Sequence, residues 1–201
     1  MKIKNFKIKN YESGYTVIET MIAISVFLVV IISGMGALLN ANLLHQKSQD
    51  MHSIMDNLSF IMEDLSRNLR TGYTFHCIND GSFANLTTPK SCASGGAIAF
   101  ENALGDKNSS ADQWVYKIES QDGGATFNIY KSVDNAQNFV QLNPSEVVMN
   151  SISGFSVVGA EVPPDTAQPF VIIKLVGKIT YKDTETPFSI QTSVSQRLPD
   201  I

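Results

Sequence analysis

The sequence has little of the chemistry that enzymes use. Its 201 residues include three histidines, which are scattered at His45, His52 and His76 and form no recognisable catalytic pairing with serine or cysteine. The sequence also lacks a Gly-x-Ser-x-Gly elbow, a phosphate-binding loop and a His-Glu-x-x-His motif. We therefore predict that the protein is not an enzyme and uses no cofactor.

Metal ligands are also sparse. The segment most similar to a calcium-binding loop is Asp106–Asp112, but it has Ala111 where such a loop needs glycine at its sixth position. At the twelfth position, where the loop needs a bidentate glutamate, the chain has Lys117. We therefore predict no metal site.

Basic charge is in short supply beyond the first 14 residues. This N-terminal segment holds four of the 15 Lys and Arg residues and one of the 19 acidic residues, so the rest of the chain carries 11 basic and 18 acidic residues. Nucleic-acid binding requires clustered Lys and Arg, and no nucleic-acid partner is predicted. The N-terminal lysines instead predict orientation, because positive residues stay on the cytoplasmic side of a membrane.

The next stretch almost lacks charge and proline. Between Tyr15 and Leu39, which is 25 residues, there is no proline and one ionisable residue, Glu19. A helix needs roughly 20 apolar residues to cross a bilayer, and only a helix or a closed barrel satisfies its own backbone in lipid. We predict a spanning helix over residues 15–44, with the N-terminus inside the cell and the rest of the chain outside.

Glu19 is the unusual residue of this helix. A carboxylate within a membrane costs about 2.5–3.5 kcal/mol on insertion scales and normally has a partner. One interpretation places Glu19 in the headgroup layer, where the positive end of the helix dipole stabilises an anion. The other interpretation pairs it with a positive charge in the apolar layer.

Residues Gly14–Glu19 read Gly-Tyr-Thr-Val-Ile-Glu and stand between the lysine-rich segment and the apolar helix. This pattern resembles the class III signal of type IV prepilins and type II secretion pseudopilins, which is Gly followed by Phe-Thr-Leu-Ile-Glu. The chain departs from it by Tyr for Phe and Val for Leu. A looser similarity relates Ile190–Arg197 to the end of the J-type minor pseudopilins.

The resemblance implies a processing site and an assembly residue. A prepilin peptidase would cut between Gly14 and Tyr15, remove residues 1–14 as a leader and methylate the new amine of Tyr15. Glu19 would pair with the N-terminal amine of a neighbouring subunit in a filament core. Other pilin or pseudopilin subunits would be partners through the N-terminal helix, and the cell membrane would hold the protein before assembly.

Beyond Asn40 the pattern becomes amphipathic. Apolar residues recur at steps of three, four and seven up to Leu69, which predicts one apolar stripe on a helix that continues to about Arg70. Glu63 and Arg67 stand four residues apart on the opposite surface. Gly72 suits the left-handed position that follows a helix end. We assign residues 45–72 to this half of the helix and expect a globular head to cover its stripe.

Cys77 and Cys92 are 15 positions apart in a segment predicted to lie outside the cell. An oxidising exterior favours a disulfide between them, and the alternative is two free thiols. Residues 73–113 are otherwise predicted as loop, apart from a short strand at Ala97–Phe100.

From Trp114 the apolar period changes to two, which indicates β-strands. Residues 114–118 and 127–130 flank a glycine-rich turn and predict a hairpin. Two final strands are predicted around a turn at 183–186, with apolar residues on one face, so the sheet is expected to be antiparallel and covered on one side only. The predicted fold class is α+β, a long N-terminal helix packed on a C-terminal antiparallel β-sheet head over residues 73–201.

Two functions remain open. The resemblance implies a minor pilin or pseudopilin that moves from the inner membrane into a type IV pilus or type II secretion pseudopilus, an extracellular or periplasmic filament. The alternative is a single-pass, membrane-anchored module that binds a ligand through an exported β-rich head and never polymerises.

Overall fold

The computed structural model describes residues 14–106, 109–124, 126–162, 164, 167–181 and 184–197, so the predicted leader lies, except for Gly14, outside the described residues. Contacts divide the chain into two compact units, Met1–Gln49 and Asp50–Ile201. In the described part of the chain one helix precedes ten strands: α1 (Val17–Thr71), β1 (Tyr73–Ile78), β2 (Cys92–Gly95), β3 (Ala97–Glu101), β4 (Trp114–Ser120), β5 (Phe127–Ser132), β6 (Val140–Gln141), β7 (Val147–Met149), β8 (Gly154–Val158), β9 (Phe170–Tyr181) and β10 (Thr184–Ser195).

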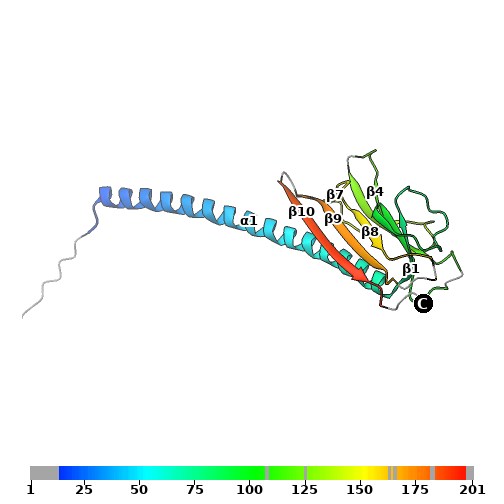
Figure 1. Ribbon diagram of the computed structural model, residues 1–201. Coiled ribbons are helices and arrows are strands. Elements are labelled where there is room, and N and C mark those ends of the chain that lie inside the picture. The colour runs from blue at the N-terminus through cyan, green and yellow to red at the C-terminus, as the bar shows by residue number, and fades with distance from the viewer. Residues whose placement is uncertain are drawn as a thin grey trace, which may run out of the picture. The chain divides into compact units, whose positions relative to one another are not determined.

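Within the unit Asp50–Ile201, the second half of α1 packs on the β-sheet (Figure 1). Its buried side chains are three or four positions apart, which is the spacing of one helix face: Ile54, Leu58, Ile61, Leu65 and Leu69. They share one apolar core with inward-facing residues of the strands. The predicted α+β class is confirmed, and so is the apolar stripe in this unit, although Met55 lies at its exposed margin.

A polar cluster also joins α1 to the sheet. The Tyr116 hydroxyl and the Lys131 ammonium of the sheet donate to Oδ2 of Asp64, at 2.9 and 3.1 Å. Asn68, one turn further along the helix, donates to Oδ1 of Asp64 at 2.8 Å and to the Tyr116 oxygen at 2.9 Å. Burial raises the pKa of Tyr116 far above its ordinary value, so its hydroxyl stays protonated and acts as the donor to Asp64.

Helix α1 ends at Thr71, close to the predicted end, but the conformation of Gly72 differs from the prediction. Gly72 does not adopt the left-handed conformation expected of a helix-ending glycine; that conformation occurs at Thr74, whose φ is 56°. The Gly72 amide donates to the carbonyl of Asn68 at 2.9 Å and continues the helical pattern. Glycine is needed here for space, because a Cβ would collide with the ring of Phe100.

The strands form one antiparallel sheet in the order β1-β3-β4-β5-β7-β9-β8-β2, with β10 paired to β9 and β6 to β5. The predicted hairpin is confirmed as β4 and β5, which pair from Val115–Ser132 to Ser120–Phe127. Asn143 is buried and fixes the segment between β6 and β7 against β5. Its Oδ1 accepts from the amide of Ile129 at 2.9 Å, and its Nδ2 donates to the carbonyl of Val147 at 2.7 Å.

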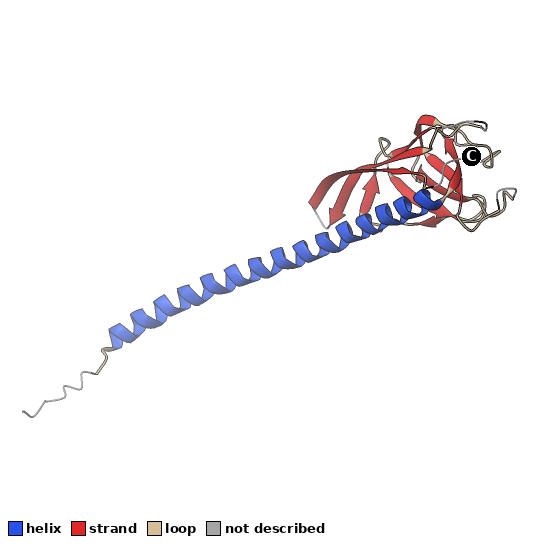
Figure 2. Ribbon diagram, turned by 60° about the horizontal axis from the view of Figure 1, so that its bottom comes forward, coloured by secondary structure: helices blue, strands red, loops and turns tan. Residues whose placement is uncertain are grey.

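Strands β9 and β10 are paired over twelve positions and lie side by side in Figure 1. Figure 2 shows the strands, in red, beside the last turns of the helix, in blue. The predicted one-faced burial of β9 is confirmed at Val171, Ile173, Leu175 and Ile179. The predicted turn at 183–186 is wrong, because β10 already begins at Thr184 and pairs with Tyr181. Polar residues such as threonine and glutamate are common at a sheet edge, and composition alone therefore placed the turn too late.

Two further expectations are wrong. The segment predicted as loop contains β1 and β2, and the sheet is not covered on one face only. A second apolar cluster lies outside the main core, where the loop after β1 and the loop after β5 pack on β3 and β4. Its members are Ile78, Leu86, Ala97, Ala99 and Val115, with Phe83, Ala136 and Phe139 at the margin. Strand β3 is consequently buried throughout its length and shows no alternation.

Candidate functional site

The residues predicted to form the processing site lie at the start of α1. Gly14, Tyr15 and Thr16 precede the helix, which begins at Val17, and all three are exposed. A hypothetical Cβ on Gly14 would contact nothing within 4 Å. The peptide bond between Gly14 and Tyr15 is therefore outside the helical hydrogen-bond ladder and accessible from solvent.

Thr16 caps the helix and thereby fixes the position of Glu19. The amide of Glu19 donates to Oγ1 of Thr16 at 3.3 Å. This arrangement has the Thr-x-x-Glu spacing of a capping box, with Glu19 at the third helical position. Thr16 was predicted only as part of the Gly14–Glu19 pattern, although its spacing to Glu19 could have identified it as the helix cap. An anion at this position also benefits from the unpaired amides of the first turn.

The first half of α1 has an apolar surface within the unit Met1–Gln49. By length and composition it is able to span a membrane. The large apolar side chains that expose more than half of their surface in this stretch are Val17, Ile18, Met21, Ile22, Ile24, Val26, Phe27, Leu28, Val29, Val30, Ile32, Met35, Leu38, Leu39, Leu43 and Leu44. An apolar surface of this extent requires a cover of lipid or of other protein chains.

The predicted disulfide is present in the head. Cys77 of β1 and Cys92 of β2 are bonded, with their Cα atoms 5.8 Å apart, so the alternative of two free thiols is not what the structure shows. Strands β1 and β2 are the two ends of the sheet order, and the bond therefore closes the sheet on itself. Backbone hydrogen bonds reinforce the closure: Lys90 accepts from the Cys77 amide at 2.9 Å and donates to the Phe75 carbonyl at 3.0 Å.

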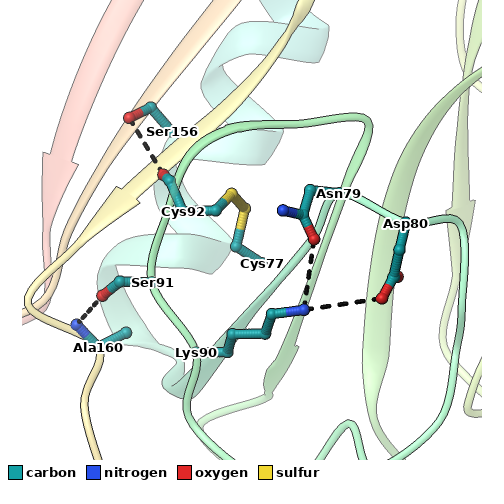
Figure 3. The surroundings of a disulfide bond; sticks show 8 residues. All are labelled: Cys77, Asn79, Asp80, Lys90, Ser91, Cys92, Ser156 and Ala160. Atoms are coloured by element: carbon teal, nitrogen blue, oxygen red, sulfur yellow. Dashed lines mark hydrogen bonds and ion pairs between the residues drawn. A yellow bond between two sulfur atoms is a disulfide. The ribbon is translucent and has the colours of Figure 1, made fainter.

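Side chains around the disulfide hold the connecting loop in place (Figure 3). The Lys90 ammonium donates to Oδ1 of Asn79 at 3.3 Å and lies 3.8 Å from the carboxylate of Asp80. On the other side, Oγ of Ser91 accepts from the amide of Ala160 at 2.9 Å. The loop is thus tied both to the end of β1 and to the segment after β8.

Replacing both cysteines, in Cys77→Ala/Cys92→Ala, is expected to lower the free energy of unfolding by about 3 kcal/mol. The reason is that a crosslink closing a loop of this size restricts the unfolded chain by roughly that amount. Thermal unfolding of the full chain in detergent, followed through the single tryptophan, Trp114, measures the loss. Reductant should lower the Tm of the parent and leave that of the variant unchanged; equal sensitivity of the two would contradict the prediction.

The structure leaves the predicted residues in two separate groups: Gly14, Tyr15 and Glu19 at the start of α1, and the cysteine pair in the head. Among the residues that the structure describes, no group of three or more His, Cys, Asp or Glu side chains is placed to hold a metal ion. The long apolar helix and the disulfide-bonded β-rich head are compatible with a membrane-anchored, pilin-like architecture. No family model matches the chain, and neither does any curated protein or solved structure.

Proposed function

We propose that the protein is a minor pilin or pseudopilin, a non-enzymatic subunit that enters a type IV pilus or type II secretion pseudopilus through the first half of α1. The observation that carries the proposal is the combination at the helix start. An exposed Gly14–Tyr15 bond precedes a capped helix whose third residue is a lone carboxylate, and an uncovered apolar surface follows.

In this proposal the apolar half of α1 has two successive covers. Lipid surrounds it while the protein is stored in the inner membrane, with the N-terminal lysines on the cytoplasmic side and the head exported. In the filament, neighbouring helices replace the lipid. A carboxylate among packed apolar helices needs a positive partner, and the amine of Tyr15 on a neighbouring subunit, released by a prepilin peptidase, supplies it.

The disulfide supports the exported location of the head. Disulfides persist in the periplasm and outside the cell and are rare in the cytosol. The Cys77–Cys92 bond links the two ends of the sheet, so an oxidising compartment, which preserves this bond, would stabilise the closed head.

Mass spectrometry of the N-terminus tests the proposal in cells that contain a prepilin peptidase. The mature protein should begin at Tyr15 and carry one methyl group on its amine. Gly14→Val should retain residues 1–14, because a branched side chain obstructs close approach to the scissile bond. A parent protein that still begins at Met1 in such cells would refute the proposal and favour the membrane-anchored binding module.

A further inference from the structure

Three unpaired oxygen atoms gather where β3 ends and β4 begins. Glu101 is the last residue of β3, and Asp112 and Gln113 directly precede β4. Glu101 is 0% exposed and Gln113 is 1% exposed. Nε2 of Gln113 donates to Oε2 of Glu101 at 3.0 Å, which fixes the two side chains against each other.

The other oxygen of each side chain has no hydrogen-bond partner. Oε1 of Glu101, Oδ1 of Asp112 and Oε1 of Gln113 are buried and unpaired, and they are three of the four such side-chain atoms in the described part of the chain. Buried acceptors without a partner are rare in native proteins and destabilise the fold. Three such atoms, all from residues at the two ends of the β3–β4 connection, point to a positively charged ligand at this place.

The backbone of Gly105 brings the two carboxylates together. A Cβ at this position would collide with the Glu101 carboxylate and would lie 3.1 Å from Oδ2 of Asp112. The Asp112 carboxylate is oriented by the amide of Asp106, which donates to Oδ2 at 3.0 Å. The loop itself is anchored by the Tyr73 hydroxyl, which donates to the Gly105 carbonyl at 2.8 Å.

We propose that Glu101, Asp112 and Gln113 form a calcium site, in which the three unpaired oxygens coordinate the ion. Ca²⁺ takes roughly six to eight oxygen ligands from carboxylates, amides, backbone carbonyls and water in flexible geometry. Mg²⁺ fits less well, because it demands a near-octahedral shell and loses water reluctantly. The site departs from the predicted absence of metal, because only Asp112 belongs to the Asp106–Asp112 segment and the other two ligands lie outside it, so the loop spacing is not followed. It is independent of the proposed function.

Calcium titration of the full chain in detergent, after removal of metal with a chelator, tests the site. At a calcium concentration about 100 times the dissociation constant, the Tm should rise by about 5–10 °C. The same concentration of Mg²⁺ should produce a much smaller rise. A parent protein whose Tm and calorimetric heat do not respond to Ca²⁺ would overturn the proposal.

Matched variants locate the ion. Asp112→Asn and Glu101→Gln should abolish most of the calcium-dependent rise in Tm, whereas Glu146→Gln, which changes an exposed carboxylate elsewhere in the head, should keep it. Glu101→Gln should not lower the calcium-free Tm, because the substitution removes a buried charge next to Asp112 and keeps the shape of the side chain. A calcium response that persists in both site variants would place the ion elsewhere and overturn the assignment.

Discussion

Glu19→Val is expected to leave membrane insertion intact and to reduce incorporation into filaments by about 100-fold or more. In the proposed filament the Glu19 carboxylate pairs with the Tyr15 amine of a neighbouring subunit. Breaking a buried ion pair by removing one partner costs about 3–5 kcal/mol, since the other charge stays buried and unpaired. Each 1.4 kcal/mol corresponds to about a factor of ten in an equilibrium constant. The substitution should not impair membrane insertion, because valine makes the helix more apolar than glutamate does.

The experiment compares the amounts of the protein in sheared filaments and in the membrane fraction by immunoblot. Ser25→Ala is the matched control. Ser25 lies in the same apolar half of α1, and its hydroxyl donates to the carbonyl of Met21 in its own helix at 2.8 Å. This variant also removes a polar group, but it should enter filaments as the parent does. If Glu19→Val were incorporated as well as Ser25→Ala, the carboxylate would have no part in assembly.

Features set by local patterns could be predicted from the sequence. The stripe from Ile54 to Leu69 follows the helical period, and only one face of such a helix can be buried. The β4–β5 hairpin was predictable because a glycine-rich turn separates two alternating segments. In β9, alternation from Val171 to Ile179 indicates which side chains face the core. In each case neighbouring residues in the chain carry the whole signal.

Features that depend on distant residues could not be predicted. Strand β1 has four consecutive buried residues because one apolar cluster lies on each of its faces, so alternation is missing. Strand β2 consists of Cys-Ala-Ser-Gly, whose small residues suit the crowded closure of the sheet but read as loop. Gly72 is required by the ring of Phe100, which lies 28 positions away in the sequence.

The candidate sites show the same contrast between features set by neighbouring residues and features set by distant ones. The residues from Gly14 to Glu19 are contiguous, so a sequence pattern was enough to single them out, and Thr16 could have been added from its spacing to Glu19. The proposed calcium ligands do not follow the spacing of a calcium-binding loop. Glu101 is the last residue of β3 and Asp112 lies near the end of the connection to β4, and the pairing of β3 with β4 brings the two ends of that connection together.

Leu65→Ala is expected to lower the free energy of unfolding by about 3–5 kcal/mol. Leu65 is fully buried in the core between α1 and the sheet. Its removal loses apolar burial and leaves a cavity, and buried Leu-to-Ala substitutions typically have effects of this size. Fluorescence of Trp114, whose ring lies 6.2 Å from that of Phe100 in this core, reports thermal unfolding of the full chain in detergent. The Tm should fall by roughly 10 °C.

The matched control is Phe60→Ala, on the same helix and five residues earlier. Phe60 is 71% exposed, so the substitution removes a larger apolar side chain that contributes little to the core. Its effect should stay within about 0.5 kcal/mol, as is usual for surface positions. The contrast separates burial from helix propensity, because both variants introduce the same residue into the same helix. Equal effects of the two substitutions would mean that this face of α1 does not pack on the sheet.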